Sequence, residues 1–115
     1  MSHVLSLWGK LFQGLHLVSD PPTKTETNTS TVDALVHGTA TFHCFVTVAG
    51  NPDNYTFSWT RQNDSSWNEA THTGMLLLDI SSVDQEDTYY CSPQNKAGHG
   101  STVPMKLNVY SERKI

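Results

Sequence analysis

Apolar and polar side chains alternate along several segments of this chain, and a period of two residues predicts β-strands. In the first such segment Ala40, Phe42 and Cys44 fall on one side, with threonine and histidine between them. Alternation of this kind indicates a strand with one buried face. The pattern recurs at 55–59, 76–80, 89–91 and 103–109, and no helical period occurs between residues 30 and 110. We therefore expect an all-β domain.

Clusters of turn-forming residues separate the expected strands. Gly38 precedes the first strand, residues 49–54 form a dense turn cluster, and residues 84–87 form an acidic turn. Gly98 and Gly100 permit the positive φ angles of a tight hairpin loop at 95–100. Residues 62–74 are polar and turn-rich, and residues 22–30 predict an extended edge strand or linker without a core face. Short strands joined by such turns indicate an antiparallel sandwich or barrel.

Composition restricts the classes of partner. The chain has 115 residues, enough for one small domain, of which 37% are apolar and 16% charged. Seven Lys and Arg stand against eleven Asp and Glu, giving a net charge of -4. This balance argues against non-specific nucleic-acid binding, which needs a basic surface. No apolar run approaches the ~20 residues of a membrane-spanning helix, so we expect no membrane insertion within this segment.

The chain contains two cysteines, Cys44 and Cys91, which lie 47 positions apart in segments of alternating polarity. Neither belongs to a CxxC pair, and two cysteines alone do not form a zinc site. They predict a disulfide, and hence an oxidising compartment.

The first twenty residues leave three alternatives open. Apolar residues from Val4 to Val18 fall three or four apart, as in an amphipathic helix. A secretory leader is the second alternative, although Lys10 interrupts the apolar stretch. The third is a strand at 15–18 that ends a preceding domain before Pro21 and Pro22.

The spacing of a few large residues carries a resemblance to a known family. A tyrosine stands two positions before the second cysteine, and the signature in chain order is Cys44, Trp59, Leu78, Ile80, Tyr89 and Cys91. This order resembles the I-set and related adhesion-type domains of the immunoglobulin superfamily. The resemblance covers about residues 22–110. It leaves 1–21 as a leader, the tail of a preceding domain or an N-terminal extension, and 111–115 as a C-terminal tail.

The resemblance implies a fold and its type. The fold is an immunoglobulin-like antiparallel Greek-key sandwich of about seven to eight strands in two sheets, with Trp59 packed on a Cys44–Cys91 disulfide. Only 18 residues separate Trp59 from Leu78. That is too few for the two extra strands of a variable-type domain, so the shorter layout is favoured.

Shorter segments of the chain refine the resemblance. Residues 51–59 and 107–110 resemble repeats of sialic-acid-binding immunoglobulin-type lectins and nephrin-like adhesion receptors. Those lectins use an arginine on a strand that here reads Thr88 to Cys91 without arginine, so sialic-acid binding is not implied. The family usually has an aspartate four positions and a glycine two positions before this tyrosine. Here Gln85 and Asp87 occupy those two positions, or else Asp87 is the usual aspartate and the turn is two residues shorter.

Three N-glycosylation sequons begin at Asn28, Asn54 and Asn63, in segments expected to be loop or edge. Together with a disulfide they predict a secreted or cell-surface protein, outside the cell.

Catalytic and metal sites are not expected. The six histidines form no HxH or HxxxH pair, and Asp84, Glu86 and Asp87 lack the spacing of a calcium loop. Nothing resembles a nucleophile elbow. We expect no enzyme activity, no metal and no cofactor.

Two aromatic residues, Trp67 and Tyr55, are candidates for an interface, because aromatic anchors dominate association energy. The alternative for Trp67 is that it caps one edge of the core. Taken together, the sequence predicts a non-enzymatic protein-recognition or spacer module of a cell-surface adhesion or immune receptor ectodomain. Its partner would be another protein, including a second immunoglobulin-like domain or itself as a homodimer. The alternatives are a secreted antigen- or carbohydrate-binding molecule and an I-set spacer of an intracellular filament protein.

Overall fold

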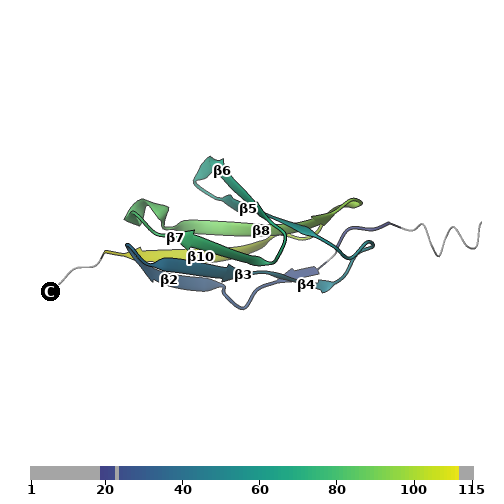
Figure 1. Cartoon of the computed structure of the whole chain (residues 1–115), viewed down its shortest axis with the longest axis horizontal. Coiled ribbons are helices and arrows are strands. Elements are labelled where there is room, and N and C mark those ends of the chain that lie inside the picture. Colours follow the sequence, from purple (N-terminus) through teal and green to yellow (C-terminus); the bar gives the residue numbers. More distant parts are fainter. Residues whose placement is uncertain (1–18, 23, 112–115) are drawn as a thin grey trace, which may run out of the picture.

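Two layers of β-strands pack face to face in the computed structural model, which describes residues 19–22 and 24–111 (Figure 1). Residues 1–18 and 112–115 lie outside the described residues, so the three alternatives for residues 1–21 and the predicted C-terminal tail at 111–115 stay predictions. No α-helix occurs among the residues described, which contain strands and one 3-10 turn.

The larger layer contains five main strands and a short sixth. Their order across the sheet is β2 (Thr31–Leu35), β10 (Val103–Tyr110), β8 (Asp87–Asn95), β5 (Thr56–Arg61) and β6 (Asp64–Thr71). The short β9 (Gly98–His99) forms the hairpin predicted at 95–100 by pairing with β8. All pairs in this layer are antiparallel except β2 with β10, which run parallel.

The smaller layer consists of two antiparallel pairs. One pair is β3 (Thr39–His43) with β7 (Met75–Asp79), and the other is β1 (Lys24–Glu26) with β4 (Phe45–Val48). Only Cys44 separates β3 from β4, so these two segments continue each other. The 3-10 turn η1 (Val83–Gln85) leads from β7 back to β8 in the larger layer.

The core lies between the layers and follows the predicted alternation. Along β8 every second residue is buried, from Asp87 through Tyr89 and Cys91 to Pro93. The buried apolar residues are Ala34, Ala40, Phe42, Cys44, Phe57, Trp59, Leu76, Ile80, Tyr89, Cys91, Met105, Leu107 and Val109. The prediction of an all-β immunoglobulin-like sandwich is confirmed.

The structure differs from the sequence analysis in three places. The polar connection at 62–74 contains the eight-residue strand β6, whose alternation is weak because it lies at a sheet edge and most of its side chains face solvent. The segment 22–30 does contribute to the interior, since β1 buries Thr25 and Pro22 is fully buried. The parallel pair arises because the N-terminal segment passes from the smaller layer at β1 to the larger layer at β2.

The smaller layer ends at β7. The chain passes from the end of β6 to the start of β7 in three residues, so no additional strand forms between them. A Cβ at Gly74 would lie 1.8 Å from the carbonyl oxygen of Cys44, so glycine is required for this close crossing. Within residues 19–22 and 24–111, β7 has a strand partner on one side only.

Candidate interaction surface

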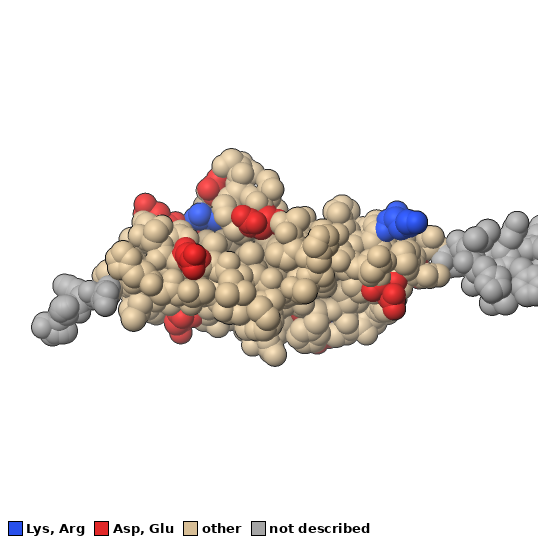
Figure 2. Space-filling view, in the orientation of Figure 1, with Lys and Arg blue, Asp and Glu red and all other residues tan. Residues whose placement is uncertain are grey.

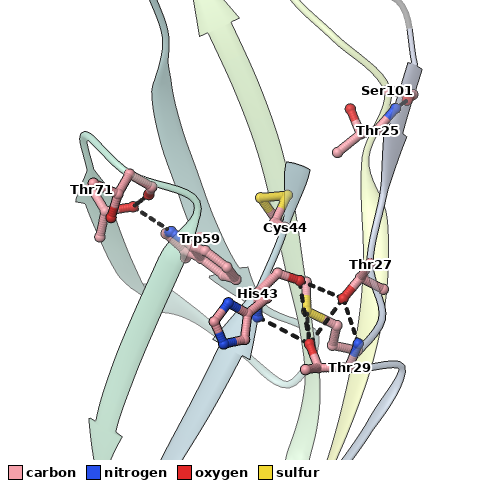
Figure 3. Close-up of a disulfide and its surroundings, with 11 residues drawn as sticks. Thr25, Thr27, Thr29, His43, Cys44, Trp59, Thr71 and Ser101 are labelled. Atoms are coloured by element: carbon pink, nitrogen blue, oxygen red, sulfur yellow. Dashed lines mark hydrogen bonds between the residues drawn. A yellow bond between two sulfur atoms is a disulfide. The ribbon is translucent and has the colours of Figure 1, made fainter. Parts of the chain in front are cut away.

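A disulfide joins the two layers at the centre of the sandwich. The sulfurs of Cys44 and Cys91 are bonded, with Cα atoms 6.5 Å apart, and the two residues are 3% and 0% exposed. Trp59 is paired with Cys91 across β5 and β8 and is fully buried. Its Nε1 donates a hydrogen bond of 2.9 Å to Thr71 Oγ1 (Figure 3). The indole therefore packs in the core with its polar atom satisfied.

Threonine hydroxyls anchor the segment between β1 and β2 beside this disulfide. The backbone N–H of His43 donates to Thr29 Oγ1 at 3.0 Å, and Thr27 Oγ1 donates to the carbonyl of His43 (Figure 3). These bonds satisfy backbone groups next to Cys44, at the junction of β3 and β4. The backbone of His43 is thus part of the scaffold, and its side chain is half-buried.

A buried carboxylate lies where β5 ends and β8 begins. Asp87 is paired with Arg61, whose Nε lies 3.0 Å from Asp87 Oδ2. The backbone N–H and the Nδ2 of Asn63 also donate to this carboxylate, at 3.1 and 3.0 Å, and Thr88 N donates at 2.7 Å. Burial acts to raise the pKa of Asp87, but the hydrogen bonds from Thr88, Asn63 and Arg61 outweigh it and lower the pKa. The side chain therefore holds a charge inside the fold.

The same end of the sandwich contains a tyrosine corner. The hydroxyl of Tyr89 donates to the carbonyl oxygen of Gln85 at 2.6 Å, four residues upstream. The Arg61 guanidinium lies 5.5 Å from the centre of the Tyr89 ring. Burial raises the pKa of Tyr89, so the phenol stays a hydrogen-bond donor. The hydroxyl bond thus ends at Gln85, and Asp87 pairs with Arg61, which was not expected from the sequence.

The two candidate aromatic anchors both contact the core. Trp67, half-buried on β6, packs edge-on against Tyr89 with ring centres 5.3 Å apart. Tyr55 packs edge-on against Phe57 at 6.2 Å, and its hydroxyl accepts from the N–H of Gly50 at 3.0 Å. A role at an interface stays a prediction for both residues.

The three sequon asparagines are exposed, but their side chains differ in what they contact. Asn28 lies in the link between β1 and β2, and Asn54 lies in the loop before β5. Asn63 lies in the β5–β6 turn, where its Nδ2 is engaged by Asp87. Glycosylation attaches to this same nitrogen.

A polar hollow of about 560 Å³ opens at the end of the sandwich formed by the β4–β5 loop and the β8–β9 hairpin. Asn95 links three segments at this end, because its Nδ2 donates hydrogen bonds to the carbonyls of Asp20 and Pro52 at 2.7 and 2.9 Å. The hollow is lined by Pro52, Asn54, Thr56, Gln94, Asn95 and Lys96.

Exposed apolar side chains gather on the outer face of the smaller layer. Leu77 is 62% exposed and Met75 is 41% exposed on β7, and Phe45 is 41% exposed on β4. An exposed role for these residues was not expected from the sequence. The signal was available, because residues 75–78 form an unbroken apolar run instead of an alternating one.

Charge is sparse on the face shown in Figure 2, where acidic side chains are scattered and no basic cluster forms. In the part of the chain that the structure describes, no three His, Cys, Asp or Glu side chains are grouped so that they could hold a metal ion. No helix there is long and apolar enough to cross a membrane.

The profile described as immunoglobulin domain matches residues 21–95, which is more than half of the chain. The chain belongs to the immunoglobulin domain family. No curated protein sequence matches this immunoglobulin domain.

Solved structures of adhesion molecules have the same fold. Sidekick-1 immunoglobulin domains 1–5 align with a TM-score of 0.60 and 16% identity, over 83% of this chain and 21% of that one. The ZIG-8 IG1 homodimer aligns with a TM-score of 0.59 and 17% identity, over 80% of this chain and 89% of that one. The full ectodomain of mouse nectin-like molecule 4 aligns with a TM-score of 0.51 and 29% identity, over 74% of this chain and 31% of that one. The immunoglobulin domain spans about a fifth of the Sidekick-1 chain and under a third of the nectin-like chain.

Proposed function

We propose that this immunoglobulin domain is a protein-recognition or spacer module in the ectodomain of a cell-surface adhesion or immune receptor. The observation that carries the proposal is the buried disulfide between Cys44 and Cys91. Disulfides of this kind persist in oxidising compartments and are rare where glutathione keeps thiols reduced. The module acts by surface complementarity and catalyses no reaction.

Two further observations support the extracellular assignment. The asparagines of all three sequons are exposed, and Asn28 and Asn54 lie on links between strands. The structures with similar folds include the four N-terminal immunoglobulin domains of Dscam1 and the full ectodomain of a nectin-like molecule. Since one fold hosts many functions, the ligand does not follow from the fold. The partner we propose is a protein, either a second immunoglobulin-like domain or another copy of this one.

The proposal is tested by making the chain in two compartments of one eukaryotic host, with and without an added secretory leader. We expect the secreted form to gain the mass of two hydrogen atoms on reduction and to lose mass on treatment with an N-glycosidase. We expect the cytosolic form to be reduced and rapidly degraded. A double variant with Cys44→Ala and Cys91→Ala serves as control and should fail to be secreted.

The opposite outcome would favour an intracellular spacer. In that case the cytosolic form would accumulate as a folded protein with free thiols, and the secreted form would carry no glycan. That result would overturn the extracellular proposal.

A further inference from the structure

The free edge of β7 has the backbone geometry of a strand that still lacks a neighbour. Ile80 N donates to Gly38 O at 2.9 Å, and Cys44 N donates to Gly74 O at 2.7 Å. Antiparallel partners exchange hydrogen bonds at alternate residue pairs, so Leu76 and Leu78 bond to β3. The N–H and C=O groups of the odd-numbered residues, Met75, Leu77 and Asp79, therefore point away from β3, toward the open edge.

The other outer strands carry charges that discourage pairing, and β7 does not. Charged side chains on edge strands are a common protection against edge-to-edge association. Such residues are Lys24 and Glu26 on β1, Asp33 on β2, and Asp64 and Glu69 on β6. On β7 the first four residues are Met and Leu, and the charge is confined to Asp79 at the end. Beyond Asp79 the edge is closed by Gln85, whose Nε2 donates to the Asp79 carbonyl at 3.0 Å.

We propose that β7 is a homotypic docking edge, which pairs antiparallel with β7 of a second copy of this chain about a two-fold axis at Leu77. The strand is self-complementary in this register. Leu77 faces Leu77 of the second copy, and this pair exchanges two backbone hydrogen bonds. Met75 faces Asp79 of that copy, whose N–H donates to the Met75 carbonyl while the Asp79 carbonyl keeps its bond from Gln85.

Side chains and charges fit the same register. On the outer face the two Leu77 side chains, each 62% exposed in the single chain, cover each other. On the inner face Leu78, which is only half-buried, lies beside Leu76 of the second copy. Each Asp79 lies beside an uncharged methionine, about 13 Å along the strand from the other Asp79, so like charges do not meet. This charge arrangement, with the backbone pattern, selects a second copy as the occupant.

The sequons leave this edge free. Asn28 lies next to β1, on the opposite side of the smaller layer, and Asn54 and Asn63 flank β5 in the larger layer. The contact is small, with five residues on each side against about 20–30 in a stable interface, so we expect a dissociation constant of about 10 μM to 1 mM. Such a contact becomes effective where many copies share one surface.

The inference rests on the proposed recognition function, for which it names a partner, but its test is separate. The full chain is studied by sedimentation at rising concentration, with Leu77→Lys as the disrupting variant and Val48→Lys as the control. Val48 is an exposed apolar residue on β4, away from the β7 edge. We expect Leu77→Lys to weaken association about tenfold or more and Val48→Lys to leave it unchanged.

Single cysteine variants test the register. Opposed residues in a hydrogen-bonded antiparallel pair lie about 5.5 Å apart, within reach of a disulfide. Under a mild oxidant, Leu77→Cys should cross-link to itself. Met75→Cys and Asp79→Cys should cross-link to each other in a mixture, and neither should do so alone. Val48→Cys gives the background.

Two results would overturn the inference. The first is a full chain that stays monomeric at all concentrations; if it then dimerises after deletion of residues 1–18, that segment is the occupant of the edge. The second is a dimer that Leu77→Lys leaves intact. The thiol and glycan state of the secreted chain is independent of both results, so failure here leaves the proposed function standing.

Discussion

Asp87 is a buried carboxylate whose surroundings keep it ionised. Four hydrogen bonds reach its two oxygens, and one comes from the guanidinium of Arg61. Breaking a buried pair from one side is costly, because the remaining charge loses its partner. This cluster therefore holds the β5–β6 turn against the start of β8.

Asp87→Asn should lower the free energy of unfolding at pH 7 by about 2–3 kcal/mol, because Arg61 loses its counter-charge and Asn63 loses an acceptor. Equilibrium unfolding in urea measures this change. Asp64→Asn is the control, since Asp64 is more exposed and its pKa is lowered mainly by hydrogen bonds from Ser66. We expect a much smaller effect from that variant.

The pH dependence follows from the direction of the pKa shift. The pKa of Asp87 is lower in the folded state than in the unfolded state, so the carboxylate stabilises the fold above about pH 4. This contribution is lost as the pH falls through the folded value. The difference between wild type and Asp87→Asn should therefore shrink from pH 7 to about pH 3. A difference that stays constant with pH would contradict this assignment.

The three sequons should differ in how often they carry a glycan. Asn63 donates through Nδ2 to Asp87, whereas Asn28 and Asn54 lie on exposed links between strands. Glycopeptide mapping of the secreted chain should show lower occupancy at Asn63 than at the other two sites. In the variant Asp87→Asn, whose acceptor is weaker, occupancy at Asn63 should rise. Full occupancy at Asn63 in the wild type would contradict this prediction.

At the scale of elements, strands with one buried face could be predicted from alternation alone. The segments that became β3, β5, β8 and β10 all show it, because each lies over the core, whereas β7 has an unbroken apolar run from Met75 to Leu78. β6 could not be predicted in this way, because most side chains of this edge strand face solvent and its sequence needs no alternation of apolar and polar residues. The partner of Asp87 also escaped, since Arg61 lies 26 positions away and pairing across a sheet leaves no local signal.

Trp67 tests whether β6 is docked to the core. If its packing on Tyr89 is structural, Trp67→Ala should lower the free energy of unfolding by about 1–2 kcal/mol. Thermal or urea unfolding measures this, with Tyr110→Ala as control because Tyr110 is 53% exposed. Self-association through β7 should survive the substitution. Unchanged stability with loss of association would instead make Trp67 an interface anchor.

At the scale of the whole molecule, one disulfide links two layers of unequal size. The smaller layer has only two antiparallel pairs, and its β7 edge is covered by no strand of the described residues. A chain this small buries a modest core. We infer that the Cys44–Cys91 disulfide supplies a large part of the net stability, and that the domain depends on an oxidising compartment for this reason.

The most direct test is equilibrium unfolding in urea of one preparation, measured with the disulfide intact and after reduction. Closing a loop of 47 residues is expected to stabilise the fold by about 4 kcal/mol. We expect a loss of about this size on reduction, enough to leave the reduced domain largely unfolded. A reduced domain that stays folded with nearly unchanged stability would contradict it and favour a module that works inside the cell.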